Sequence, residues 1–157
     1  MMYIRPFQEN DLNELINLFY ETVHSINRKD YTNIQVNAWA DKAELNRRHA
    51  SWGEEFKRNF TYVARVDQQI VGFCDLTSSG LLDRLYIHKN YQRRGIASEL
   101  LEKMQQTARL NDMKQLYTEA SITAVPFFRA KGFSLVKSQL VEKNGIQLKN
   151  FLMAKEL

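Results

Sequence analysis

A short basic stretch with a single glycine, Asn90 to Ser98, constrains the fold of this chain more than any other segment. The β-prone run Leu81–His88 precedes it, and the helix-prone run Ala97–Leu110 follows with apolar residues near helical spacing. These patterns predict a strand, a tight loop and the start of a helix. The first turn of a helix has backbone N–H groups without intrahelical partners and carries a partial positive charge. Such a junction can bind an anion, and we interpret it as a pyrophosphate site.

The residue types in this loop fit that interpretation. Gly95 lacks the Cβ that would keep a phosphate away from the backbone, and Ala97 leaves the next approach nearly as open. Gln92, Arg93 and Arg94 add side-chain donors. The loop has neither the Gly-Lys-Ser/Thr ending of a Walker loop nor the three-glycine spacing of a dinucleotide site. An ordinary basic loop at a helix start is the alternative explanation.

Two motifs resemble those of a known family. Gln92 to Ala97 (Gln-Arg-Arg-Gly-Ile-Ala) resembles the Q/R-x-x-G-x-G/A motif of the GNAT superfamily of acetyl-CoA-dependent N-acyltransferases. Ala124 to Phe133 resembles the later A-x-x-F-Y-x-x-x-G-F segment of the same family. The motifs stand in the family's order, and a strand is expected before each. The resemblance extends from Ile4 to the last strand and is least specific between Asn27 and Asn59.

Hydrophobic periodicity predicts the elements of the fold. Helical spacing is expected in three N-terminal segments, in a long helix after the glycine loop and in a short helix ended by Gly132; these segments are Leu12–Ile26, Asn33–Ala43, Glu44–Lys57, Ala97–Leu110 and Ala124–Lys131. We expect Gly53 to interrupt the third segment. Strands are predicted at Tyr3–Phe7, Phe60–Val66, Ile70–Thr77, Leu81–His88, Gln115–Ala120, Phe133–Val141 and Ile146–Ala154.

The connections between these elements predict the architecture. The helix between Leu81–His88 and Gln115–Ala120 implies a parallel strand pair, and Asn144-Gly145 is a strong hairpin signal. The prediction is a three-layer α/β (α+β) fold with a mixed, mostly antiparallel central sheet flanked by helices. The GNAT resemblance implies the same fold.

Length and composition set wider limits. At 157 residues the chain is expected to form one domain over residues 1–157. It has no apolar run long enough to span a membrane and no stretch resembling a signal peptide, so we expect a soluble cytoplasmic protein without membrane partners. The single Cys74 lies in an apolar run and is interpreted as a buried thiol.

Charge bears on the partners of the protein. The net charge of +4 fits an anionic ligand, but the basic residues form no long block and no recognisable nucleic-acid motif. We therefore expect no nucleic-acid partner. The sequence allows a homodimer through its last hairpin.

The resemblance implies acetyl transfer from acetyl-CoA to an amine by direct attack in a ternary complex, with no metal. It places Tyr86 and Ile87 beside the pantetheine arm, which would pair with them like an extra strand. The cofactor residues that it implies belong to the strand end, the loop and the later motif; they are Leu85, Tyr86, Ile87, Gln92, Arg93, Arg94, Gly95, Ile96, Ala97, Ser98, Phe127 and Phe128.

The attacking amine must be neutral. Deprotonating a lysine-like amine of pKa about 10.4 at pH 7 costs about 4.6 kcal/mol. A carboxylate, or a water chain ending on one, can take this proton. Asp83 interrupts an apolar strand and Glu119 ends the next strand, so both are candidate bases, with His24 as a third. The alternative for Asp83 is a solvent-exposed carboxylate or a partner of Arg84 or Arg65.

The leaving thiolate is where the chain departs from the family. The family's usual acid is the Tyr of the later motif, and Phe128 stands at that position. Ser121 replaces an Asn that is often found earlier in the segment. Substitutes for the acid are Ser121, Tyr117, Tyr31 or water.

The acceptor pocket is expected between the N-terminal helices and the strand edges. Its candidate wall consists of His24, Tyr31, Trp39 and Trp52, because aromatic faces attract cationic amines. Ordinary packing is the alternative for each residue. The predicted function is an N-acetyltransferase acting on a small amine, a peptide N-terminus or a lysine. The rival is an acyl-CoA-binding sensor or regulatory domain without catalysis, which Phe128 favours.

Overall fold

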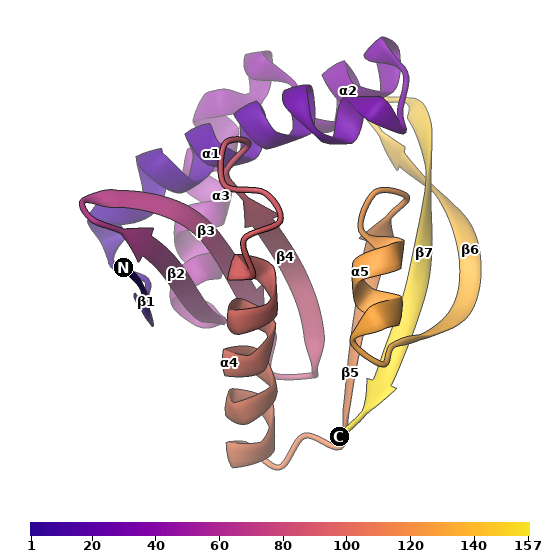
Figure 1. The fold of residues 1–157 in the computed structure, drawn as a ribbon. Helices are drawn as coiled ribbons and strands as arrows, with labels where there is room; N and C mark the ends of the chain where they lie inside the picture. Colours follow the sequence, from indigo (N-terminus) through magenta and orange to yellow (C-terminus); the bar gives the residue numbers. More distant parts are fainter.

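A seven-stranded mixed sheet forms the frame of the computed structural model, which describes residues 1–157 (Figure 1). Its strands are β1 (Met2–Pro6), β2 (Phe60–Val66), β3 (Gln69–Leu76), β4 (Leu81–Ile87), β5 (Gln115–Ser121), β6 (Ser134–Lys143) and β7 (Ile146–Glu156). Their spatial order is β1-β2-β3-β4-β5-β7-β6. Only β4 and β5 pair in parallel, as the helix between them requires, and every other neighbouring pair is antiparallel.

Helices cover both faces of this sheet. The helices are α1 (Leu12–Ser25), α2 (Asn33–Trp39), α3 (Leu45–Arg58), α4 (Ile96–Leu110) and α5 (Val125–Ala130), with short 3-10 turns at Glu9–Asp11, Asn27–Lys29 and Lys42–Glu44. The first core cluster joins α1, α2 and α3 to one face, and the second joins α4 and α5 to the other. The predicted three-layer arrangement of helices around a mixed, mostly antiparallel sheet is therefore confirmed.

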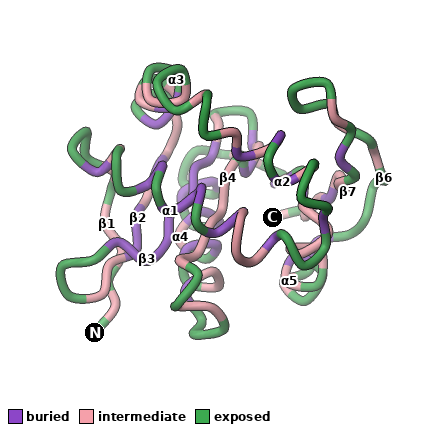
Figure 2. The backbone as a smooth tube through the Cα atoms, turned by 90° about the horizontal axis from the view of Figure 1, so that it is seen from above, coloured by how far each residue is buried: buried purple, intermediate pink, exposed green.

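Burial is concentrated in the middle of the sheet. Every residue of β3 after Gln69 is buried, because helices cover the strand on both sides (Figure 2). Cys74 lies in this strand and is fully buried, as expected. The edge strand β6 is mostly exposed. No helix has the length and apolar character that crossing a membrane requires.

The second and third helices differ from the expectation. The second helix ends at Trp39 rather than Ala43, because Ala40 leaves the helical region and the Asp41 side chain accepts a hydrogen bond from the Ala43 N–H at 2.9 Å. The third helix runs through Gly53 without a break. A Cβ on Gly53 would lie 3.3 Å from the Leu12 side chain, so a small residue allows α1 and α3 to pack closely.

The sheet opens between β4 and β5. Leu81 pairs with Tyr117 and Leu82 with Thr118, and the two strands form no further pairs beyond these. Asp83 is the extra residue of a β-bulge, because Arg84 pairs with Asp75 while Leu82 pairs with Leu76. The second halves of β4 and β5 thus separate at the point where Asp83 lies.

The last two strands form the predicted hairpin. Asn144 and Gly145 connect β6 to β7 with φ of 51° and 78°. Positive φ at both positions is what a two-residue hairpin turn of this kind needs, and Asn-Gly supplies it with little strain. The hairpin lays β7 against β5, where Ser121 pairs with Asn150.

Candidate active site

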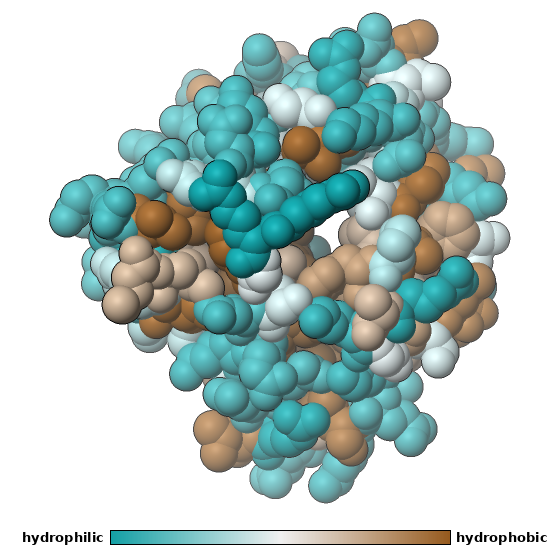
Figure 3. Space-filling view, viewed as in Figure 1, coloured by the Kyte–Doolittle hydropathy of each residue, from teal (hydrophilic) through white to brown (hydrophobic).

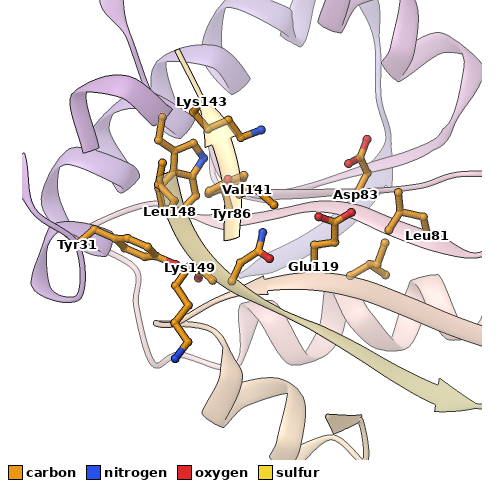
Figure 4. Close-up of a pocket in the computed structure, with 13 residues that line it drawn as sticks. Tyr31, Leu81, Asp83, Tyr86, Glu119, Val141, Lys143, Leu148 and Lys149 are labelled. Carbon is orange, nitrogen blue, oxygen red and sulfur yellow. Dashed lines mark hydrogen bonds between the residues drawn. The ribbon is translucent and has the colours of Figure 1, made fainter. Parts of the chain in front are cut away.

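Two cavities meet where β4 and β5 separate. The larger has a volume of about 810 Å³ and lies along the glycine loop, the start of α4 and α5. The smaller has a volume of about 240 Å³ and lies against β6, β7 and the α2 region (Figure 4). Five residues line both cavities: Trp39, Asp83, Tyr86, Glu119 and Ser121. A molecule in one cavity can therefore reach a molecule in the other across the opened sheet.

The glycine loop folds as a helix start of unusual backbone geometry. Gly95 is the N-cap of α4 with φ 81°, and Arg93 is also left-handed with φ 61°. No atom outside the loop lies within 4 Å of the position of a Cβ on Gly95, so the space beside it is open. The Gln92 Nε2 donates to the Ile87 carbonyl at 2.7 Å. Gln92 therefore holds the loop against the end of β4, and it also lines the larger cavity.

The larger cavity collects nearly all the residues that were expected to contact the cofactor. Those that line it are Leu85, Tyr86, Ile87, Gln92, Arg93, Gly95, Ile96, Ala97, Ser98, Phe127 and Phe128. Arg94 does not line it, and its guanidinium lies 4.8 Å from the centre of the Tyr91 ring. Lys29 and Lys89 line it as well. Sequence reasoning missed these two lysines because no local motif marks them.

In the view of Figure 1, the surface of this region is open. The space-filling picture shows an opening in the centre of the face, with both hydrophilic and hydrophobic side chains along its border (Figure 3). The cavity lining is mixed in the same way, with apolar residues of β4 and α5 and basic residues near the loop. A long ligand with charged and apolar parts fits such a surface.

The two candidate bases come together on facing strands. Asp83 on β4 and Glu119 on β5 line both cavities and lie at the same end of the smaller one (Figure 4). The Asp83 side chain is 35% exposed and lies 3.3 Å from the Arg84 guanidinium. The Glu119 carboxylate accepts a hydrogen bond from the Gln139 Nε2 at 2.9 Å. Both carboxylates can reach water and a ligand in either cavity.

A buried ion pair supports the bulge at Asp83. Asp75 is fully buried and lies 2.6 Å from Arg84, whose guanidinium also contacts Glu55 at 3.1 Å. Burial raises the pKa of Asp75 to about 6, against the opposing effects of Arg84 and of a hydrogen bond from Asn59. The Asp75 Oδ1 has no hydrogen-bond partner. Sequence reasoning missed Asp75, although a single charge inside the apolar run Ile70–Leu76 was a usable signal.

The hydroxyl groups of Ser121 and Tyr31, two candidates for the acid, have different hydrogen-bond partners. The Ser121 Oγ accepts a hydrogen bond from the Ala124 N–H at 3.2 Å and lies 3.5 Å from the Asn27 Nδ2. The Tyr31 hydroxyl donates to the Lys149 carbonyl at 2.6 Å and accepts from the Ile122 N–H at 2.9 Å, so its proton is already in use.

Tyr117 is the third candidate for the acid, and Phe128 stands at the position of the family's usual acid. Tyr117 lines neither cavity, because its hydroxyl lies 3.4 Å from the Ser79 Oγ near the turn before β4. This position argues against Tyr117 as the acid that protonates the leaving thiolate. Phe128 is 3% exposed and packs against Phe127 and Phe133 at ring distances of 5.2 and 5.1 Å. It acts as a core residue at the edge of the larger cavity.

Two of the four residues expected in the wall of the acceptor pocket line a cavity, and two do not. Tyr31 and Trp39 line the smaller cavity, with their ring centroids 5.4 Å apart. His24 lines neither cavity, because its Nε2 lies 2.9 Å from the Ala40 carbonyl at the end of α2. Trp52 is buried under Arg84, 4.8 Å from the Phe19 ring. Both residues thus lie outside the two cavities, unlike the expected wall of the acceptor pocket.

The C-terminal hairpin supplies the other side of the smaller cavity. Its lining residues from β6 and β7 are Val141, Lys143, Leu148, Lys149 and Asn150. Asn150 pairs with Ser121 across the strands, and its Oδ1 is buried without a hydrogen-bond partner. Sequence reasoning missed this wall, because only the Asn-Gly turn hinted that these strands fold back toward β5. No group of three or more His, Cys, Asp or Glu side chains is arranged to hold a metal ion.

Known proteins share both the sequence pattern and the fold. The family model of the acetyltransferase (GNAT) domain matches residues 27–157. The chain is 34% identical over 150 residues to the uncharacterized N-acetyltransferase YafP of Escherichia coli strain K12, a match that covers 96% of this chain and 93% of that protein.

Solved structures extend the likeness to the whole chain. A GCN5-related N-acetyltransferase from Rhodopseudomonas palustris superposes with a TM-score of 0.93 at 26% identity, over 99% of this chain and 95% of that one. The PaiA N-acetyltransferase of Thermoplasma acidophilum, solved in complex with coenzyme A, has a TM-score of 0.82 at 18% identity, over 100% of this chain and 99% of that one. The second likeness shows the fold.

Proposed function

The chain belongs to the GNAT acetyltransferase family, and we propose that it moves an acetyl group from acetyl-CoA directly to an amine in a ternary complex. One observation carries the proposal: the same residues of β4 and β5 line a large and a small cavity that meet between the strands. A donor in the first cavity and an acceptor in the second would share this boundary. We further propose that residues 1–157 act as one domain, because both helical layers pack on one sheet, and that this domain works in the cytoplasm.

The larger cavity suits the donor. The free N–H groups at the start of α4 and the open space beside Gly95 fit a pyrophosphate. Beyond Leu82, β4 has no pairing partner on its β5 side. Apart from the Ile87 carbonyl, which accepts from Gln92 and Thr22, its backbone there is available to an extended pantetheine arm. Lys29, Lys89 and Arg93 line the same cavity and supply positive charge for the phosphates. These residues support acetyl-CoA as the acyl donor.

The smaller cavity suits the amine. Tyr31, Trp39 and Tyr86 give it an aromatic wall, which can attract a cationic amine by about 0.5–2 kcal/mol. Asp83 and Glu119 lie at its boundary with the donor cavity, where one of them can take the amine proton directly or through water. The neutral nitrogen then attacks the thioester carbonyl, and the thiol of CoA leaves.

A second candidate function is an acyl-CoA-binding domain without catalysis. Phe128 favours it, since a buried phenyl ring stands where the family's usual acid would be. The two functions agree on donor binding and differ on turnover.

Thiol release decides between them. The protein is mixed with acetyl-CoA and, in separate reactions, a small amine, a peptide with a free N-terminus and a peptide with an internal lysine. We expect release of free thiol together with an equal amount of acetylated amine, above the rate without amine. Binding of acetyl-CoA without turnover on any amine class would favour the sensor. Absence of both binding and turnover would overturn both functions.

A further inference from the structure

Tyr86 occupies the boundary between the two cavities. It is the only one of the seven tyrosines that lines both of them. Its ring is held on two sides by the Phe19 ring at 5.1 Å and the Phe73 ring at 5.7 Å. Figure 4 labels it among the residues that line the smaller cavity, and it lies on β4, the strand that also carries Asp83. The ring is therefore held in a defined place beside the opened strands.

The phenolic proton of Tyr86 is free for a ligand. No side-chain hydrogen bond joins the Tyr86 hydroxyl to another residue, and its oxygen is not among the fully buried atoms that lack a partner. The hydroxyl can therefore donate its proton to a ligand. The other tyrosines of the cavities differ, because the Tyr31 hydroxyl donates to Lys149 and the Tyr91 hydroxyl donates to Gln69.

Few groups can donate a proton to the leaving sulfur, and Tyr86 and Ser121 carry the two hydroxyls that line both cavities. The phenyl ring of Phe128 has no proton to give, and the Tyr117 hydroxyl lies outside both cavities. A hydroxyl in the shared boundary, with its proton free, fills this chemical need.

Resting on the function proposed above, we infer that Tyr86 is a catalytic residue whose hydroxyl donates a hydrogen bond to the leaving sulfur of the acyl donor. The amine nitrogen forms its bond to the carbonyl carbon, and the bond between carbon and sulfur breaks with its electron pair passing to sulfur. The proton of the amine goes to Asp83 or Glu119 and then to water. The thiolate, held by the Tyr86 hydroxyl, takes a proton from water, and Tyr86 keeps its own.

The surroundings of Tyr86 suit a donor that never ionises. Burial raises the pKa of Tyr86 well above its ordinary value of 10.0, and Arg84 and the Trp39 indole only partly oppose this effect. The hydroxyl therefore stays neutral and protonated throughout the neutral pH range. This agrees with a step in which it donates a hydrogen bond without giving up its proton.

The direct test is the acidity of the thiol in bound CoA, measured from the ultraviolet absorbance of the thiolate as pH is raised. Removing a hydrogen bond to a charged sulfur costs about 1.5–3 kcal/mol, so Tyr86→Phe should raise the pKa of the bound thiol by about one to two units. The kcat with acetyl-CoA should fall about 10- to 100-fold. The Cys74 thiol should not add to the thiolate absorbance, because burial raises its pKa well above the ordinary value.

Tyr117→Phe is the matched control, since it removes a hydroxyl that lines neither cavity, and it should leave both quantities unchanged. If Tyr86→Phe folds poorly, 3-fluorotyrosine at position 86 preserves the ring and strengthens the donor, and it should lower the thiol pKa. An unchanged thiol pKa in either variant would overturn the inference. A wild-type protein that binds CoA but transfers no acetyl group would instead overturn the proposed function, because the thiol titration does not need turnover.

Discussion

The Arg84 guanidinium lies 2.6 Å from the buried Asp75 carboxylate, on the residue that directly follows the bulge at Asp83. The same guanidinium contacts Glu55 at 3.1 Å and lies 4.5 Å from the centre of the Trp52 ring. A charged side chain with this many fixed partners holds the backbone of β4 at the point where the strand leaves β5. The geometry of the opened sheet thus depends on an ion pair between β3 and β4.

Asp75→Asn should change how stability depends on pH. The pKa of Asp75 rises from 3.8 to about 6 on folding, so the folded protein holds this proton more tightly than the unfolded chain. The stabilising effect is complete below pH 3.8 and is lost as pH rises through 6. At 1.36 kcal/mol per pK unit, the loss is about 3 kcal/mol.

Urea unfolding of both proteins between pH 4 and 8 measures this effect. The free energy of unfolding of wild type minus that of Asp75→Asn should decrease up to about pH 6 and then level off. Parallel curves for the two proteins would show that Asp75 does not titrate in this range.

Gly95→Trp should abolish binding of the donor. The indole would fill the open space beside the start of α4, where we place the pyrophosphate. The protein should then lose the rise in Tm that CoA causes in wild type, because only a ligand that binds the folded state raises Tm. Gly145→Trp is the control, with a similar φ of 78° and equally open surroundings in the β6–β7 turn. A normal CoA-induced Tm rise in Gly95→Trp would refute the phosphate site.

Asp83→Asn and Glu119→Gln should slow acetyl transfer most below the pKa of the amine. Under these conditions the acceptor arrives protonated and needs a base, and loss of a general base typically costs about 10²- to 10⁴-fold. The measurement is kcat/KM against pH for each variant. Glu156→Gln, which lies at the far end of β7, should behave as wild type. If both variants keep the wild-type pH profile, neither carboxylate is the base.

Tyr31→Phe should destabilise the protein without changing donor binding. The Tyr31 hydroxyl bridges the Lys149 carbonyl of β7 and the Ile122 N–H that follows β5. Leaving these backbone groups without their partner costs about 1–3 kcal/mol. Thermal unfolding gives the loss, with Tyr117→Phe as the comparison. An unchanged Tm would mean that water replaces the hydroxyl at no cost.

Local patterns predicted the parts of the site that depend on neighbouring residues in the chain. The glycine loop needs only a strand, a turn and a helix start, and all three leave clear signals between Leu81 and Leu110. Asp83 was predicted because it interrupts an apolar strand, and Glu119 because it ends the next strand. The parallel pairing of the two strands brings both residues to the same opening. Their roles remain proposals.

Long-range contacts explain what the patterns could not predict. The place of Asn150 depends on its pairing with Ser121, which is set by the register of β7 on β5. His24 turns away from the cavities because of a contact with Ala40, whose position follows from an early end of α2. Gly53 stays helical since the close packing of Leu12 offsets the low helix propensity of glycine.

Calorimetric titration of the wild-type protein with acetyl-CoA tests the central claim most directly, because every proposed role depends on a donor in the larger cavity. We predict a single site with micromolar affinity, on the order of −8 kcal/mol. Dephospho-CoA, used as the comparison ligand, should bind more weakly if a lysine of this cavity contacts the 3′-phosphate. Absence of binding by acetyl-CoA would contradict the account and remove the basis for every site residue assigned from the glycine loop.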